Sequence, residues 1–272
     1  MRTLLIFLLI VSGQLVLAQG YLPGGGRSMS MANATVAVED EWAFFNNPAA
    51  ITGIKKFKAG ISYENRFLLK ALQSQAAVAA LPLGKGVLSL GAHNYGYTQF
   101  RSYRAGIGYG MKLSEHFSMG AQINYQGLAL NENYGSINTM TADVGLFAEI
   151  NPKWKVGLSV FDIGRAKLSM DEDDRFTTTM RLGTSYQFSD RVLISIEGNK
   201  DLDDPLRFRS GIEYQVVDDF YLRGGVATNR LELTFGMGYA FSLFRLDLGT
   251  SYDQILGWSP NFSLLFLNKK DQ

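Results

Sequence analysis

Apolar and polar residues alternate in one short segment after another from residue 57 to residue 266. The clearest example is 103–113, where Tyr103, Ile107 and Met111 alternate with Arg104 and Lys112. A period of two is that of a β-strand, whose successive side chains point to opposite faces. About fourteen such segments follow one another, each close to the ~10 residues of a strand that crosses a bilayer in a barrel. The alternation therefore predicts an all-β chain of antiparallel strands.

The connections between these segments alternate between tight and loose. Tight turns are expected near Gly84, Ser114–Glu115, Asn151–Pro152, Ser189–Asp190, Asp218–Asp219 and Ser242. Looser loops are expected near Arg66–Leu72, Gln99–Ser102, Asn131–Ser136, Lys167–Arg175, Lys200–Pro205, Thr228–Arg230 and Gln254–Ser259. Short turns at one end and longer loops at the other are typical of outer-membrane barrels, and an even strand number puts both termini at the tight-turn end. We therefore predict a bacterial outer-membrane location with both termini periplasmic.

The two alternating faces differ in their chemistry. One is apolar in nearly every segment, while the other carries glycine, hydroxyls and charges of both signs. A barrel in lipid must be a closed ring that is apolar outside, whereas a soluble barrel would be apolar inside. Aromatic residues also gather toward the segment ends, as in two interfacial girdles. The expected fold is an antiparallel transmembrane β-barrel of about 14 strands with an N-terminal hatch, or plug, in its lumen; the alternative is a soluble all-β secreted protein.

The first part of the chain has the features of a secretory signal peptide. Arg2 supplies the positive start, residues 4–16 are mostly apolar, and Ala18 precedes a cleavage point ahead of Gln19. A membrane anchor is the alternative, but the apolar run is shorter than the ~20 residues that a spanning helix needs. We predict a signal peptide at 1–18, a hatch segment at 19–54 and a transmembrane barrel at 55–268.

The segment 24–51 is too irregular for a long helix and too short for a domain. It opens with three glycines and then carries the acidic residues 39–41 and the aromatic residues of 42–45. Pro48 suits the first turn of a short helix that runs to Ile51, and Asn47 suits its cap. We interpret this segment as a compact plug inside the barrel.

The hatch and the charges that face it form the expected functional site. The hatch residues expected to bind a ligand or gate the lumen are Arg27, Glu39, Asp40, Trp42, Phe44, Phe45, Asn47 and Pro48. The charges expected to face the lumen are Arg181, Arg207, Arg209, Glu213, Arg223, Glu232, Arg245 and Asp247. Such charges could line a pore, but buried charges are retained by partners. We expect them to pair with one another and with the acidic residues 39–41.

Several glycines on the inward face have two interpretations of equal weight. They leave room for a hatch backbone, or they let a small barrel curve. These residues are Gly106, Gly108, Gly110, Gly183, Gly211, Gly236, Gly238 and Gly249.

The composition excludes several classes of function. The chain has no cysteine, which excludes disulfides and thiolate sites, and its net charge of +1 gives no reason to expect a nucleic acid. We find no nucleophile elbow, no complete phosphate-binding loop and no zinc-protease motif. We predict a protein that is not an enzyme and has neither a cofactor nor a metal site.

Two histidines and two acidic loops are the remaining candidates for chemistry. His93 beside Asn94 is faintly similar to the His/Ser/Asn site of outer-membrane phospholipases, but no serine can be placed against it, so a girdle or lumen histidine is favoured. His116 lies in a tight turn and is expected to be solvated. The acidic loops at 171–174 and 201–204 could hold Ca²⁺ or bridge cations to lipopolysaccharide; a loop kept out of the membrane by its charge is the simpler explanation.

The hatch segment resembles the N-terminus of the FadL-type outer-membrane proteins and their Bacteroidota relatives, the PorV/PorQ-type proteins. The resemblance lies in residues 27–31, 34–40 and 47–49. It implies a fourteen-stranded barrel with an N-terminal hatch. Two positions depart from the pattern, because Asn33 stands where a glycine is usual and Glu41 extends the acidic stretch. The chain is also short for a transporter of this type, so long extracellular loops that form a surface groove are not expected.

The resemblance implies two functions. We expect a non-enzymatic accessory or scaffold barrel of PorV/PorQ type, with protein partners in a secretion or surface-assembly machine such as type IX secretion. The alternative is a FadL-like passive transporter, in which a hydrophobic ligand binds near Trp42, Phe44 and Phe45 and leaves sideways through a strand kink. A lipid hydrolase built on His93 is the third hypothesis. Outer-membrane lipid and lipopolysaccharide are expected partners in each case.

Overall fold

Antiparallel strands make up nearly all of the regular structure. The computed structural model describes residues 23–130, 135–166, 175–202 and 204–268. The strands are β1 (Lys58–Asn65), β2 (Gln73–Leu83), β3 (Gly86–Tyr97), β4 (Phe100–Lys112), β5 (Phe117–Leu130), β6 (Ser136–Asn151), β7 (Trp154–Phe161), β8 (Thr179–Ser189), β9 (Val192–Asp201), β10 (Arg207–Val217), β11 (Phe220–Ala227), β12 (Glu232–Phe241), β13 (Phe244–Asp253) and β14 (Gly257–Phe266). The short helices are α2 (Gly26–Ser30), α3 (Ala43–Asn46) and the 3₁₀ turns η1 (Ala50–Gly53), η2 (Arg66–Leu68) and η3 (Lys70–Leu72).

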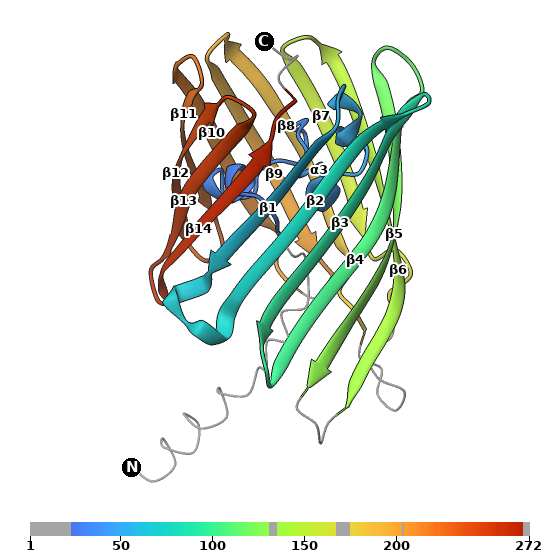
Figure 1. Ribbon diagram of the computed structural model, residues 1–272, viewed down its shortest axis with the longest axis vertical. Coiled ribbons are helices and arrows are strands. Elements are labelled where there is room, and N and C mark those ends of the chain that lie inside the picture. The colour runs from blue at the N-terminus through green and yellow to red at the C-terminus, as the bar shows by residue number, and fades with distance from the viewer. Residues whose placement is uncertain (1–22, 131–134, 167–174, 203, 269–272) are drawn as a thin grey trace.

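The fourteen strands close into a single barrel. Each strand pairs with its neighbours in sequence, and β1 pairs with β14 from Ala59↔Phe266 to Glu64↔Asn261 (Figure 1). Closure leaves no strand edge unpaired, as a sheet surrounded by lipid requires. The prediction of a fourteen-stranded antiparallel barrel is confirmed. No helix among the described residues is long and apolar enough to cross a membrane.

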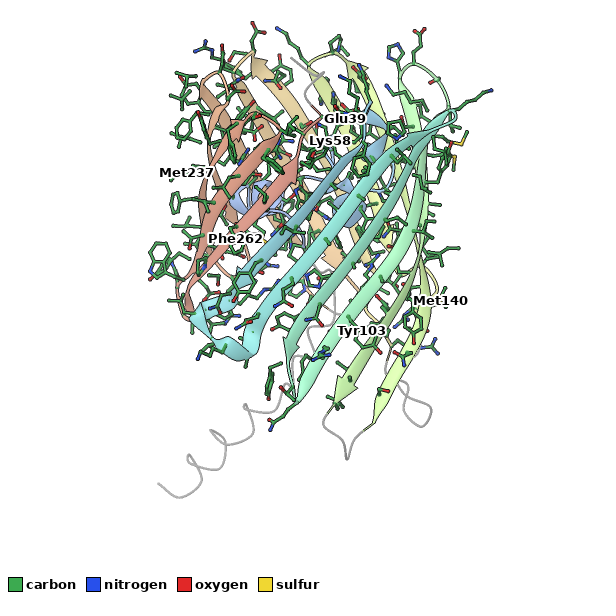
Figure 2. The ribbon with its side chains drawn as sticks, in the orientation of Figure 1. Glu39, Lys58, Tyr103, Met140, Met237 and Phe262 are labelled. Carbon is green, nitrogen blue, oxygen red and sulfur yellow. The ribbon has the colours of Figure 1, made fainter. Side chains whose placement is uncertain are left out.

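The barrel is apolar outside and polar inside. In β8, Leu182 is 58% exposed on the outer surface while its neighbour Arg181 is 0% exposed. Met140 and Met237 likewise lie on the outer surface (Figure 2). The inward positions carry buried serine, threonine, asparagine and charged side chains. This sorting is the reverse of a water-soluble barrel, so the interpretation of the alternating faces is confirmed.

The connections also follow the expected alternation, with one exception. At one end β12 and β13 are joined by residues 242–243, while at the other β7 and β8 are joined by residues 162–178. The expected loop at Gln99–Ser102 is wrong, because β3 ends at Tyr97 and β4 begins at Phe100. Gly96, at φ 109°, helps the chain to reverse within two residues, and the buried Ser102 continues the inward face of β4.

Residues 24–54 fold inside the lumen. They form α2, α3 and η1, which Figure 1 shows within the ring of strands. The expected boundary between residues 54 and 55 falls between the end of η1 and the start of β1. The expected helix from Pro48 to Ile51 is a 3₁₀ turn that begins two residues later, at Ala50. Asn47 instead accepts the N–H of Ala49 with its side-chain oxygen at 3.0 Å, which closes a local turn ahead of η1.

Candidate functional site

The centre of the hatch is an aromatic cluster. Trp42, Phe44 and Phe45 are at most 2% exposed, and they pack with Ala76, Val78 and Leu265 of the barrel wall. The rings of Phe44 and Phe45 meet edge to face with centroids 5.0 Å apart, a favourable geometry for aromatic pairs. The sequence placed these three aromatic residues in the hatch, and the structure brings all three together against β1, β2, β3 and β14.

Glycines of the wall leave room for the hatch backbone. A Cβ added to Gly157 would lie 2.1 Å from the carbonyl oxygen of Val36, and one added to Gly120 would lie 2.3 Å from that of Pro48. Of the glycines singled out in the sequence, those against the hatch are Gly110, Gly183, Gly211, Gly236 and Gly249. Those against barrel side chains are Gly106, Gly108 and Gly238. Gly110, Gly183, Gly211, Gly236 and Gly249 therefore leave room for the hatch, as the first of the two interpretations expected.

A connected network of charges joins the hatch to β10, β11 and β13. Arg27 donates to both carboxylate oxygens of Glu213, at 2.7 and 2.9 Å, and lies 3.3 Å from Asp40. Glu213 also accepts from Arg223 at 2.5 Å, and Arg223 reaches Asp247 at 2.6 Å. The network holds the hatch acids and wall arginines as mutual partners, so these charges do not line an open pore.

The far end of the network is Arg245, which reaches Asp247 at 3.1 Å and Glu41 at 2.9 Å. Burial, together with the adjacent Glu41, raises the pKa of the Asp40 carboxyl to about 6, against the opposing effect of Arg27 and Arg245.

A second ionic contact holds the opposite side of the hatch. Arg181 makes two hydrogen bonds to Glu197, at 2.6 and 2.9 Å, and donates to the carbonyl oxygens of Asn33 and Asn46. Glu197 in turn accepts the N–H of Val36 at 3.0 Å. Both side chains are fully buried. One wall ion pair thus satisfies three backbone groups of the hatch.

Two hatch residues have partners that the sequence did not indicate. Glu39 pairs with Lys155 rather than with an arginine of the lumen. The side-chain amide of Asn47 donates to the carbonyl oxygens of Val36 and Leu146, at 2.9 and 3.0 Å, and so ties the hatch to β6.

The departure at Asn33 has a conformational explanation. Ala32 and Asn33 have φ values of 52° and 57°, in the left-handed region. Glycine adopts this region most easily, and asparagine is among the residues that tolerate it. Asn33 therefore fits the backbone at a position where the family pattern has glycine.

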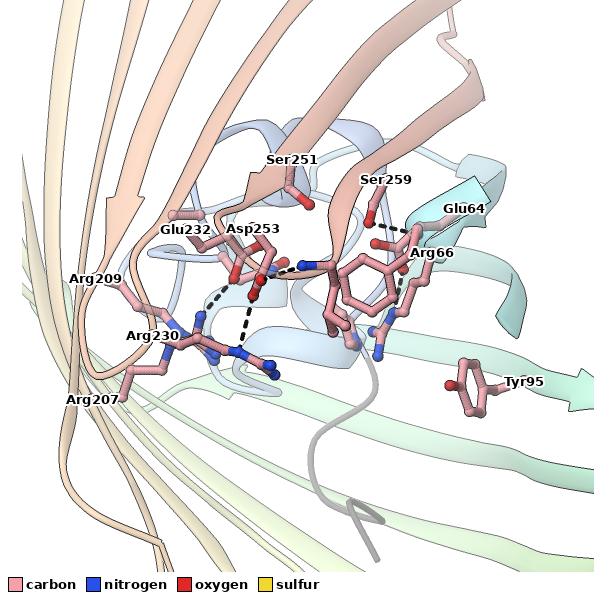
Figure 3. Close-up of a pocket in the computed structure, with 15 residues that line it drawn as sticks. Glu64, Arg66, Tyr95, Arg207, Arg209, Arg230, Glu232, Ser251, Asp253 and Ser259 are labelled. Carbon is pink, nitrogen blue, oxygen red and sulfur yellow. Dashed lines mark hydrogen bonds and ion pairs between the residues drawn. The ribbon is translucent and has the colours of Figure 1, made fainter. Parts of the chain in front are cut away.

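A cavity of about 380 Å³ lies in the lumen between the hatch and the long-loop end of the barrel (Figure 3). Arg207 pairs with Glu232 at 2.5 Å, Arg230 with Asp253 at 3.1 Å, and Arg66 with Glu64 at 2.9 Å. Arg209 also lines the cavity and lies 4.0 Å from Glu197. Sequence reasoning found Arg207, Arg209 and Glu232 but missed the other charges. The sequence does not indicate them because only the pairing register of the strands brings these residues, which are far apart in the chain, to the same level of the barrel.

An apolar groove of about 440 Å³ lies on the outer face of β1, β2, β3 and β14. Its outward residues include Ile61, Tyr63, Ala77 and Phe262. Ala76 also lines it, and the same residue packs against the hatch aromatic cluster on the inner side. Small side chains thus make the wall thin between the cluster and the groove.

His93 faces the lumen rather than the membrane. Its Nε2 lies 2.8 Å from the hydroxyl of Ser74, its ring lies 6.1 Å from that of Phe45, and it is buried. A serine therefore does stand against His93, contrary to expectation, but Asn94 points the other way and donates to Gln75. Among the described residues no carboxylate or amide side chain is hydrogen-bonded to Nδ1 of His93, and the further interaction of the ring is with the backbone of Pro23, so the imidazole lacks the third side chain of a catalytic triad. The lumen histidine is the better interpretation.

The acidic loops provide no metal site in the part of the chain that the structure describes. Residues 171–174 and Asp203 lie outside the described residues. Asp201 accepts a hydrogen bond from Thr179. His116 is exposed in a tight turn, as expected.

A closed barrel of fourteen strands, apolar outside and containing a hatch, is the fold of the FadL-like outer-membrane barrels. No protein-family model and no curated protein matches the sequence. Among solved structures, the chain is similar to CymD, a monoaromatic hydrocarbon channel, with 13% identity and a TM-score of 0.72 over 93% of this chain and 99% of that chain.

Two further structures extend the comparison. The Ralstonia pickettii toluene transporter TbuX has 14% identity and a TM-score of 0.65, over 92% of this chain and 98% of that chain. A Pseudomonas aeruginosa FadL homologue has 12% identity and a TM-score of 0.59, over 90% and 97%. At these identities the likeness establishes the fold.

These matches overturn the preferred functional hypothesis. The matched structures are described as hydrocarbon channels, toluene transporters and a FadL homologue, and none of those described here is a secretion component or an enzyme. The prediction of a PorV/PorQ-type scaffold with partners in a type IX secretion machine is therefore wrong. The hatch motif that suggested it does not separate the two kinds of barrel.

Proposed function

We propose that the protein is a FadL-like passive transporter of hydrophobic small molecules in the bacterial outer membrane. One observation carries this proposal: the aromatic cluster of the hatch and the apolar outer groove lie on opposite sides of the same thin stretch of wall. The fold similarity to hydrocarbon channels supports it.

The route that we propose leads from the hatch cluster toward the groove and then into the membrane. The wall between them contains Ala76, Ala77, Gly91 and Ala92, whose side chains are small or absent. The strand kink expected as a lateral exit does not occur there, because β1, β2 and β3 pair without a register shift. Register shifts lie instead at the tight-turn ends of β6, β8 and β10. Lateral exit therefore requires the hatch and this wall to move together.

The hatch residues have distinct roles in this proposal. Trp42, Phe44 and Phe45 contact the hydrophobic ligand, while Arg27 and Asp40 hold the hatch closed through their ion pairs. Asn47 fixes the hatch to β6. Among the wall charges, Arg181, Glu213 and Arg245 bind the hatch, whereas Arg207 and Glu232 pair with each other.

The proposed orientation places the tight turns in the periplasm and the longer loops outside the cell. Phe266, at the end of β14, lies at the tight-turn end, where it pairs with Ala59. Pro23 lines the cavity at the opposite end of the lumen. Lipopolysaccharide would then surround the rim that bears the longer loops.

Uptake by cells tests the proposal. A host whose outer membrane resists hydrophobic compounds is given this protein, and the entry of a labelled monoaromatic hydrocarbon and a labelled fatty acid is measured. We expect faster entry of at least one of them than in cells with an empty vector. A Trp42→Ala variant present in the membrane at the same level should lose most of the gain. Entry rates equal to the empty-vector control for both compounds would refute the proposal.

A further inference from the structure

The cavity at the long-loop end differs in chemistry from the aromatic cluster of the hatch. Arg66, Arg207, Arg209 and Arg230 line it together with Glu64, Glu232 and Asp253 (Figure 3). Among the described residues, four cations and three carboxylates line it. Arg209 also has an acid partner outside the cavity, since it lies 4.0 Å from Glu197, which pairs with Arg181 as well.

The cavity also has apolar walls. Phe67 and Leu256 line it, and Tyr95 stands with its ring 5.3 Å from the guanidinium carbon of Arg66. Its volume of about 380 Å³ lies within the range of small-molecule sites, which hold a ligand by apolar walls and a few placed polar groups. A compact ring with one charged group fits this combination better than a neutral hydrocarbon does.

The ion pairs inside the cavity are open to exchange. The side chains of Arg207 and Glu232 are 29% and 26% exposed, and that of Arg230 is 54% exposed. Ion pairs in contact with water contribute little to stability, so a ligand carboxylate can replace one acid at low cost. The Nε of Arg207 is buried and has no hydrogen-bond partner among the described residues. A planar carboxylate matches the donor geometry of a guanidinium.

We infer that this cavity is a binding site for small aromatic carboxylates, whose carboxylate lies among Arg207, Arg209 and Arg230 and whose ring lies against Phe67 and Leu256. The inference rests on the proposed transport function in that it narrows the class of cargo from hydrophobic molecules in general to those with an acidic group. Lipid headgroups are a poor alternative, because the lining side chains face the lumen and the wall separates them from the bilayer.

Binding to the purified full-length barrel in detergent tests the inference. Calorimetric titrations compare benzoate with benzamide, which keeps the ring without the charge, and with sulfate, which keeps the charge without the ring. We expect benzoate to bind at least ~10-fold more tightly than either, as charge-assisted hydrogen bonds and ring burial together imply. Equal affinity for benzamide would overturn the role of the arginines, and equal affinity for sulfate would overturn the aromatic part.

Two substitutions with opposite expected effects on benzoate affinity separate ligand recognition from folding. Arg207→Gln should weaken benzoate binding about 10-fold, whereas Glu232→Gln should tighten it, because it removes a competing carboxylate. Arg101→Gln, at an exposed arginine outside the cavity, should leave binding unchanged. If Arg207→Gln fails to fold, the Glu232→Gln result decides alone. Unchanged or weaker binding in Glu232→Gln would overturn the inference.

Failure of this inference and failure of transport are distinguishable. Benzoate binding in detergent does not depend on passage through the barrel. Hydrocarbon entry without benzoate binding would overturn the carboxylate site and leave transport standing. Benzoate binding without uptake of either labelled compound would overturn the transport proposal and leave the carboxylate site standing.

Discussion

Arg181 illustrates how a single residue secures the hatch. Its guanidinium is fully buried, pairs with Glu197 and donates to backbone carbonyls at two points of the hatch. A buried charge that loses its partner is strongly destabilising. Arg181 and Glu197 therefore keep all of their hydrogen-bond partners only while the hatch is in place.

Replacing Arg181 with methionine should lower the free energy of unfolding by about 3 kcal/mol, because the buried Glu197 would lose both of its hydrogen bonds from Arg181 and keep only Arg209, 4.0 Å away, as a charged partner. Urea denaturation in detergent micelles measures the change. The double variant Arg181→Met/Glu197→Gln is the matched control, since it removes the stranded charge and should recover at least half of the loss. Equal destabilisation in the single and double variants would show that the charge is not the cause.

Asp40 gives the hatch a dependence on pH. Its pKa is about 6, above the ordinary value of 3.8, so between these values the folded state binds more protons than the unfolded state. Stability then rises as pH falls through 6, and the gain is complete below 3.8. The groups that face Asp40 are Arg27, Glu41, Glu213 and Arg245.

The Asp40→Asn variant isolates this contribution from that of other carboxylates. Its stability relative to the wild type should be greatest near pH 7.5 and should decline toward pH 4.5, because only the wild type gains from protonation of residue 40. Parallel stability curves for the two proteins over this range would contradict the assignment.

At the scale of elements, the hatch and the wall strands are shaped to one another. Gly157 of β7 and Gly120 of β5 meet hatch carbonyl oxygens at distances that no side chain would permit. The hatch has short helices and turns of its own, but its position depends on these wall contacts. Its conformation is therefore set largely by the barrel.

A side chain at Gly157 should displace the hatch without breaking the barrel. Gly157→Val would place carbon against the Val36 carbonyl, and overpacking of this kind costs about 1–3 kcal/mol or more. We expect a folded barrel with ion conductance in planar bilayers well above that of the wild type.

Gly224→Val is the matched control for this experiment. Its added Cβ would lie 3.7 Å from its nearest neighbour, an ordinary contact, so its conductance should equal that of the wild type. Unchanged conductance in Gly157→Val would contradict the hatch as the seal.

The strands could be predicted from the sequence far better than the site could. A period of two is local, so 103–113 alone indicates β4, and the tight turns follow from where the alternation breaks. The hatch helices could not be placed, because Ala43–Asn46 is held by wall residues more than 100 positions away, such as Arg181. The cavity required knowledge of register, which brings Glu64, Arg230 and Asp253 to one height.

At the scale of the whole molecule, the barrel is apolar outside and polar inside, and the hatch fills much of its lumen. The outward face suits lipid, and the hatch residues 24–52 are largely buried, with several of their side chains fully so. Fold class followed from the alternation, but function did not. The hatch motif covers a short stretch common to two kinds of barrel, and the comparison of whole structures was needed to favour a transporter.

The central claim is that this barrel passes hydrophobic molecules while its lumen stays closed to hydrophilic ones. Proteoliposomes with lipopolysaccharide in the outer leaflet test both halves at once, through the entry of a labelled aromatic compound and of labelled sucrose. The account predicts entry of the aromatic compound above that into protein-free vesicles, and sucrose entry no faster than into them. Rapid sucrose entry, or aromatic entry equal to that of protein-free vesicles, would contradict it.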